Sequence, residues 1–154
     1  MKISGYIRLI VTSIAAICIA GCQNEGPIGY KFGVWRIDSY SADGIPVTDI
    51  LVENTTIAFQ GGAINVIALR DNYMNSFDQY GSWTEEGNTL YLNFTHSDDN
   101  HPAGSDFYAA PYWLGWTSEE VMAFEVEKHS NREMTWRYIS PAGVVNIYKL
   151  HKTW

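Results

Sequence analysis

Cysteine is scarce in this sequence of 154 residues, and both copies, Cys18 and Cys22, lie near its start. A disulfide framework needs paired cysteines within the folded domain, and residues 23–154 contain none. The domain must therefore be stabilised by packing. A stretch of about 130 residues is long enough to bury a hydrophobic core of its own.

Long hydrophobic runs are also lacking. The apolar run Leu9–Ala20 is interrupted by Thr12 and Ser13, and it falls short of the roughly 20 apolar residues that span a bilayer. Lys2 and Arg8 precede it, and small residues end it. This is the pattern of a secretory signal peptide.

The residues Ile19-Ala20-Gly21-Cys22 resemble the lipobox of bacterial lipoproteins. In that family the cysteine sulfur is lipidated, the leader is cut just before it, and the mature protein usually carries three acyl chains, palmitate among them. The resemblance implies a signal peptide over residues 1–21, a lipidated Cys22 with a short linker over residues 22–29, and a domain over residues 30–154. Gln23 stands where an inner-membrane retention signal often has Asp, which favours the outer membrane, on its periplasmic or its surface face.

Positive charge is in short supply beyond the leader. Residues 22–154 hold 8 Lys and Arg against 17 Asp and Glu, a net charge of −9. Nucleic-acid partners require clusters of basic side chains, so this composition argues against them. An anionic membrane surface would also repel such a domain, which leaves the lipid anchor to hold it at the membrane.

Short alternating segments separated by turn residues are abundant, and they predict an all-β barrel or sandwich. Residues 77–84 and 89–94 form the clearest hairpin, with residues 85–88 as its turn. Further strands are expected at residues 32–41, 55–60, 63–70, 120–128, 132–139 and 144–152. Residues 47–52 fit either a short strand or an irregular connection. About eight strands in neighbour order suffice to close an up-and-down barrel, and a sandwich of the same strands is the alternative.

The residues Gly33-Val34-Trp35 resemble the Gly-x-Trp motif in the first strand of lipocalins. Residues 81–83 (GSW), 88–94 (NTLYLNF), 134–138 (MTWRY) and 148–152 (YKLHK) resemble the spaced motifs of lipocalin-like domains on lipoproteins of Gram-negative anaerobes. The resemblance covers about residues 30–152 and implies an eight-stranded antiparallel barrel, with Trp35 across its closed base and Gly33 permitting close backbone approach. The disulfide of secreted lipocalins is lacking, so their ligand class does not carry over.

The candidate ligand-binding residues are large side chains that either point inwards by alternation or belong to the aromatic-rich segment at residues 107–116. Trp and Tyr suit ligands with an apolar body and one polar end. The candidates are Trp35, Phe59, Tyr112, Trp113, Trp116, Phe124, Trp136 and Tyr138. So many large side chains could also fill an eight-stranded barrel.

Few motifs in the sequence indicate metal binding or catalysis. His96, Asp98, Asp99 and His101 share one segment, but their spacing matches no recognised zinc pattern. Ser97 lies between His96 and Asp98, whereas catalytic triads are assembled from distant positions. We therefore expect no metal, no cofactor and no enzymatic activity.

Two functions remain open. The first is a lipid-anchored, lipocalin-like envelope protein that binds a small apolar or amphipathic molecule without catalysis. The alternative is a protein-interaction or accessory module of an envelope or surface complex, built on a filled barrel. The packing of the barrel interior separates them.

Overall fold

The segments with alternating apolar and polar side chains form one sheet, and its strands follow one another in sequence order. The computed structural model describes residues 26–71 and 75–154, so the predicted signal peptide, Cys22 and the start of the linker lie outside the described residues. The elements are the 3₁₀ helix η2 (Gly26–Lys31), β1 (Gly33–Ala42), β2 (Ile45–Pro46), α2 (Ile50–Glu53), β3 (Thr55–Gln60), β4 (Ala63–Asp71), β5 (Asn75–Glu86), β6 (Thr89–Asn93), the 3₁₀ helix η3 (Tyr112–Leu114), β7 (Met122–His129), β8 (Glu133–Ile139) and β9 (Val145–Lys152).

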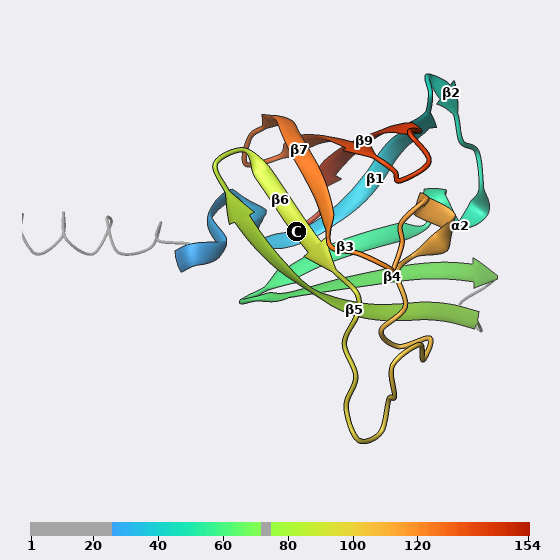
Figure 1. Ribbon diagram of the computed structural model, residues 1–154. Helices are drawn as coiled ribbons and strands as arrows, with labels where there is room; N and C mark the ends of the chain where they lie inside the picture. The colour runs from blue at the N-terminus through green and yellow to red at the C-terminus, as the bar shows by residue number, and fades with distance from the viewer. Residues whose placement is uncertain (1–25, 72–74) are drawn as a thin grey trace, which may run out of the picture.

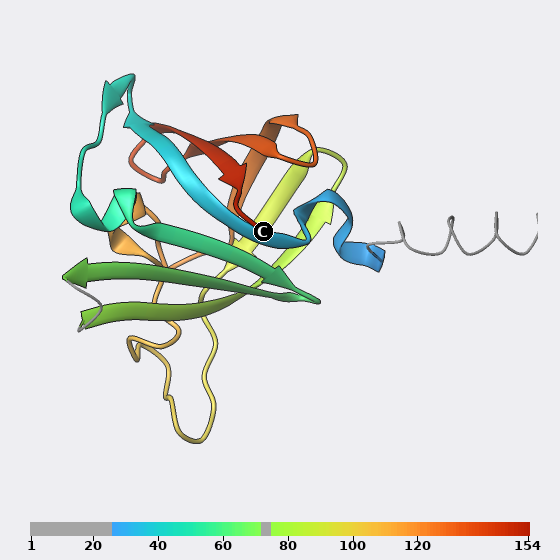
Figure 2. The ribbon, with the colours of Figure 1, turned by 180° about the vertical axis from the view of Figure 1, so that it is seen from behind.

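The sheet closes on itself because its first long strand pairs with its last (Figures 1 and 2). β1 pairs antiparallel with β9, with Trp35 opposite Lys152 and Tyr40 opposite Tyr148. On its other side β1 pairs with β3, while the two-residue β2 pairs only with the end of β1. Strands β1 and β3–β9 thus form the predicted eight-stranded barrel, and the sandwich alternative is wrong.

The structure differs from the sequence expectations mainly between β1 and β3. The ambiguous residues 47–52 contain most of α2, a single helical turn whose N-cap, Asp49, accepts a hydrogen bond on its side chain from the Leu51 amide. β5 also runs on to Glu86, so the turn of the central hairpin has two residues rather than four. Of these two, Gly87 has a positive φ of 59°.

The interior is built from alternate residues of the strands. In β7 the pattern buries Met122, Phe124 and Val126 and exposes the residues between them. The large side chains expected to point inwards from alternation are all buried: Trp35, Ile37, Ile57, Phe59, Leu90, Leu92, Phe94, Met122, Phe124, Val126, Met134, Trp136 and Tyr138. Alternation therefore predicted this part of the core correctly.

The barrel has two unlike ends (Figure 1). The base end carries η2 and the tight turns β3–β4, β5–β6 and β7–β8. The mouth end carries α2, the long connection over residues 94–121 that contains η3, and the β8–β9 turn. Within the described ranges, none of the helices has the length and apolarity to cross a bilayer.

Candidate functional site

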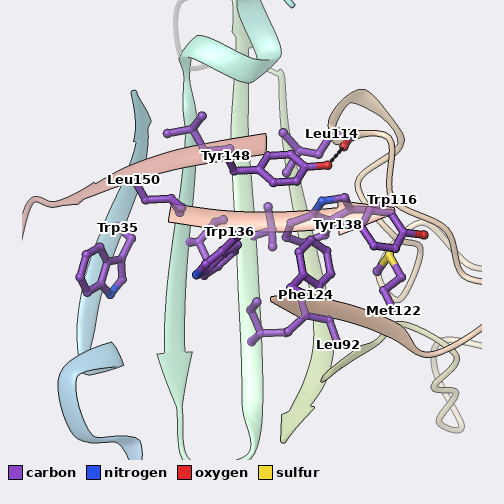
Figure 3. Packing of buried hydrophobic residues seen from close by; sticks show 14 of the residues in the cluster. Trp35, Leu92, Leu114, Trp116, Met122, Phe124, Trp136, Tyr138, Tyr148 and Leu150 are labelled. Carbon is purple, nitrogen blue, oxygen red and sulfur yellow. Dashed lines mark hydrogen bonds between the residues drawn. The ribbon is translucent and has the colours of Figure 1, made fainter. Parts of the chain in front are cut away.

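The structure brings most of the candidate ligand-binding residues into one buried cluster (Figure 3). The exception is Tyr112 in η3, whose side chain is 64% exposed. The buried candidates are Trp35, Phe59, Trp113, Trp116, Phe124, Trp136 and Tyr138. The strands supply five of them, and the connection over residues 94–121 supplies Trp113 and Trp116.

Aromatic rings contact one another along the inside of the barrel. Phe124 stacks on Tyr138 with 4.8 Å between ring centroids and meets Trp116 edge-on at 5.2 Å. Trp136 lies 5.8 Å from Phe124 and 6.1 Å from Phe59. Edge-to-face and offset contacts of this kind are favourable beyond the area they bury. The central part of the barrel is therefore filled by its own side chains.

Four aromatic side chains of the buried cluster nevertheless keep an unpaired donor. The indole Nε1 atoms of Trp83, Trp116 and Trp136 and the hydroxyl of Tyr138 are buried, and none has a hydrogen-bond partner among residues 26–71 and 75–154. Buried donors are normally satisfied by protein, by water or by an acceptor of a bound molecule. The interior is thus apolar in bulk but offers hydrogen bonds to a molecule that reaches it.

The base end is closed by a buried ion pair and a close backbone contact. Lys31 is 1% exposed, and its ammonium group pairs with Glu85 and lies 5.0 Å from the centre of the Trp83 ring. Trp35 donates a hydrogen bond from Nε1 to the Lys31 carbonyl at 2.8 Å. Gly33 has φ of 120°, and the Val34 amide donates to the Trp154 carbonyl at 2.7 Å. These contacts agree with the base predicted for Trp35 and Gly33.

The mouth end is covered by α2 and η3. Trp113 donates from Nε1 to the Thr55 hydroxyl at 2.9 Å, which ties η3 to the start of β3. Tyr148 donates from its hydroxyl to the Leu114 carbonyl at 2.6 Å (Figure 3). Burial raises the pKa of Tyr148 well above its ordinary range, so this donor stays protonated. With Leu114 and Val52 buried beneath them, α2 and η3 form a cap.

A pocket of about 320 Å³ opens in the barrel wall between β1 and α2. β1 pairs with β3 only from Gly33 to Arg36, because the chain passes through β2 and α2 before β3 begins. The bulge between Ile37 and Ser39 adds to this irregularity. We call this opening the side pocket. Its volume is at the lower end of the range for small-molecule sites.

The side pocket has an apolar wall and a polar rim. The apolar lining consists of Ile37, Tyr40, Pro46, Val47 and Val52, and the polar lining consists of Arg36, Asp38, Ser39, Thr48 and Glu53. Arg36 donates from Nε and Nη2 to the Glu53 carbonyl, at 3.3 and 3.0 Å, and so holds α2 at the rim. Asp38 pairs with His151 of β9. Ile37, Tyr40 and Val52 belong to the core, so the pocket reaches the barrel's inner packing from outside.

Asp98, His101 and Tyr108 form a local set of contacts that we call the Asp98 network. The Asp98 carboxylate accepts hydrogen bonds from the Tyr108 hydroxyl at 2.7 Å and the His101 amide at 2.7 Å, and it lies 3.1 Å from His101 Nδ1. His96 contacts the edge of the Tyr108 ring. In the part of the chain that the structure describes, no group of three or more His, Cys, Asp and Glu side chains is arranged to hold a metal ion.

Sequence reasoning did not find the side pocket. Most of its lining lies in β1 or in the ambiguous stretch before β3. The sequence signal that could have indicated the pocket is the pattern of residues 47–52. These residues lack the alternation of apolar and polar side chains that the predicted strands show. A break in alternation beside an otherwise regular barrel marks a place where the wall is not continuous sheet.

The chain matches no protein-family model, and no curated protein matches it. Its structure is similar to that of an uncharacterized protein from Bacteroides eggerthii, with a TM-score of 0.59 and 19% identity over 79% of this chain and 98% of that chain. It is also similar to a lipocalin-like protein from Bacteroides uniformis, with a TM-score of 0.52, 19% identity and the same two coverages. At this identity the similarity shows the fold, which is a lipocalin-like barrel.

Proposed function

We propose that this chain is a lipid-anchored protein of the bacterial cell envelope that uses its lipocalin-like barrel to bind a small amphipathic molecule without altering it. The binding site is the side pocket between β1 and α2. The observation that carries the proposal is an opening of about 320 Å³ that leads from a polar rim to core side chains, next to an interior whose centre is filled.

The anchor is proposed from the leader. The apolar run before Cys22 and the small residues Ala20 and Gly21 support lipidation of Cys22 after removal of residues 1–21. Two or more acyl chains hold a protein stably on a bilayer, whereas one is marginal. Gln23 supports an outer-membrane destination.

The lining of the side pocket defines the class of ligand. Ile37, Val47 and Val52 accept an aliphatic or aromatic body, and the hydroxyls of Ser39 and Thr48 serve a polar end. Small-molecule sites commonly combine an apolar wall with a few placed polar groups. The ligand is therefore expected to be small, mostly apolar and polar at one end.

The test is to fill the side pocket from its rim. Thr48 is exposed and lines the pocket, so Thr48→Trp is expected to block entry without disturbing the core. The control is Thr84→Trp, at an exposed position of β5. Binding is measured with an apolar fluorophore that brightens on burial, in competition with envelope lipid extracts, and by the rise in melting temperature.

We expect Thr48→Trp to weaken binding at least about tenfold, a loss of about 1.4 kcal/mol, and Thr84→Trp to leave it unchanged. Equal binding by both variants would remove the side pocket as the site. Failure of every probe to bind or to stabilise the wild type would contradict ligand binding as the function.

A second candidate function is that of a protein-interaction or accessory module in an envelope or surface complex. The filled centre of the barrel favours it, since a filled barrel acts through its loops and outer wall. Crosslinking in cells followed by pull-down of the lipidated protein should then recover a defined neighbour. Recovery of bulk envelope proteins alone would contradict this candidate.

A further inference from the structure

The two ends of the barrel carry very different charge. The mouth-end segments over residues 43–54, 94–121 and 140–144 contain no Lys or Arg, and at the end of β4, which also lies at the mouth, Arg70 is offset by Asp71. Their acidic residues are Asp43, Asp49, Glu53, Asp98, Asp99, Asp106, Glu119 and Glu120. The base-end segments over residues 26–32, 60–63, 85–89, 127–133 and 151–154 are balanced, with four acidic and four basic residues. The net negative charge of the domain is therefore concentrated away from its base.

The balanced base end also carries an exposed aromatic pair. Phe32 is 47% exposed and Trp154 is 76% exposed, and their ring centroids lie 6.2 Å apart. Phe32 directly follows η2, and Trp154 is held beside it by the bond from the Val34 amide. Figure 2 shows the end of β9 beside the start of β1 and η2. The pair thus lies where the N-terminal segment enters the barrel.

We propose that the base end of the barrel docks onto a lipid bilayer, with Phe32 and Trp154 at the membrane–water interface and the mouth end directed away from it. The proposal rests on the lipid anchor at Cys22. Gly26, where η2 begins, follows Cys22 by four positions, and four steps of fully extended chain span at most about 14 Å. An anchored Cys22 therefore keeps η2, and Phe32 after it, close to the headgroups.

The side chains at the base suit this contact. Tryptophan is enriched at membrane–water interfaces because its ring is apolar and its N–H is polar. The basic residues of the base, such as Lys128, Arg132 and Lys152, offset its carboxylates, so an anionic surface does not repel this end. Exposed apolar residues also occur at the mouth, but Ile45 and Ile50 lie beside Asp43 and Asp49. Approach of the mouth to an anionic bilayer is therefore unfavourable.

The experiment uses the full lipidated chain in vesicles of phosphatidylethanolamine and phosphatidylglycerol with brominated acyl chains. An environment-sensitive fluorophore is attached to a cysteine introduced by Thr153→Cys at the base or by Ile50→Cys at the mouth. We expect a blue shift and several-fold stronger bromine quenching at position 153 than at position 50. A fluorophore at position 153 that stays as water-exposed as one at position 50, on protein that floats with the vesicles, would overturn the docking and leave the anchor intact.

Substitution of the aromatic pair separates docking from anchoring. The double variant Phe32→Ser and Trp154→Ser should still float with the vesicles, yet lose the blue shift and the quenching at position 153. The matched control is Ile45→Ser and Ile50→Ser at the mouth, which should keep both signals. Retention of the signals in the first variant would overturn the role of the pair. Protein that fails to float at all would overturn the anchor and the docking together, and ligand binding by the side pocket is measured separately.

Discussion

At the scale of the residue, Lys31 has a charged side chain that is buried in the folded protein. Its ammonium group is stabilised by the carboxylate of Glu85 and by the faces of the Tyr30 and Trp83 rings. Tyr30 donates its hydroxyl to the other oxygen of Glu85 at 3.0 Å. Glu85 is thus the shared partner of the two groups that close the base.

Removal of Glu85 should cost more than removal of Lys31. Glu85→Leu leaves a buried ammonium group without its counter-ion and is expected to lower the free energy of unfolding by about 2–3 kcal/mol. Lys31→Met keeps the aliphatic stem without the charge and should cost less than about 1 kcal/mol. Urea denaturation of both variants checks the order, and a larger loss in Lys31→Met would contradict it.

At position 33, in the base of the barrel, there is no room for any side chain larger than that of glycine. A Cβ atom there would lie 2.1 Å from the Trp154 carbonyl oxygen, and φ of 120° is strained for any other residue. Gly33→Ala is expected to lower the free energy of unfolding by about 2–3 kcal/mol. The control is Gly62→Ala, where a Cβ would meet no atom within 4 Å and φ is not positive. Thermal unfolding measures the loss of stability in each variant. An equal loss in Gly33→Ala and Gly62→Ala would contradict the close contact between Gly33 and the Trp154 carbonyl.

The Asp98 network makes a testable contribution that depends on pH. The hydrogen bond from the Tyr108 hydroxyl holds the pKa of Asp98 well below its usual range. Because the folded-state pKa is depressed, the network is fully stabilising above the ordinary carboxyl pKa of about 4 and is lost as pH falls towards the folded-state value.

Tyr108→Phe should therefore raise the pKa of Asp98 and move the loss of the network to higher pH. NMR titration of the carboxyl carbon measures this shift. Tyr112→Phe is the control, since Tyr112 is exposed and contacts Phe77 and Trp113 rather than Asp98. An unchanged titration in Tyr108→Phe would show that another donor sets this pKa.

At the scale of the element, the strands could be predicted where one face is core and the other is solvent. β8 alternates in sequence and in burial along its whole length and β7 does so up to Glu127, and their predicted bounds lie within two residues of the structure. α2 could not be predicted, because a single turn capped by Asp49 leaves too little periodicity to recognise. Its position depends on Arg36, which is far from it in sequence but holds its last carbonyl.

The candidate site was predictable only in part for a related reason. Alternation says that Trp136 and Phe124 point inwards, but it does not say whether a space is left between them. That depends on the summed volumes of side chains from all eight strands and on the cap. The side pocket depends in addition on where β1 and β3 stop pairing, which is a property of two separated segments.

The cap supports a prediction about η3. Trp113→Ala removes both the buried ring and the bond to Thr55, and is expected to lower the free energy of unfolding by about 3–5 kcal/mol. Trp113→Phe keeps most of the ring and loses the bond, at a cost of about 1 kcal/mol. Hydrogen exchange should show faster amide exchange in η3 and α2 for Trp113→Ala alone. Unchanged exchange there would mean that Trp113 does not hold the cap.

At the scale of the whole molecule, stability depends on the seam between β1 and β9. Lys149 is exposed and lies between Ser39 of β1 and Thr135 of β8. Proline there cannot donate to a ladder and is expected to cost on the order of 3 kcal/mol. The control is Lys149→Ala, which loses only the exposed side chain and should cost less than about 0.5 kcal/mol. Equal melting temperatures for the two variants would contradict a closed seam.

The seam also sets the order in which the molecule can be completed. A chain that emerges from a ribosome or a translocation channel presents β1 first and β9 last, so β1 has to wait for a partner more than a hundred residues behind it. Until then, one long edge of the growing sheet has exposed amides and carbonyls that a neighbouring chain could pair with. The nascent protein is therefore exposed to edge-to-edge aggregation with other copies of itself until residues 145–152 have paired with β1.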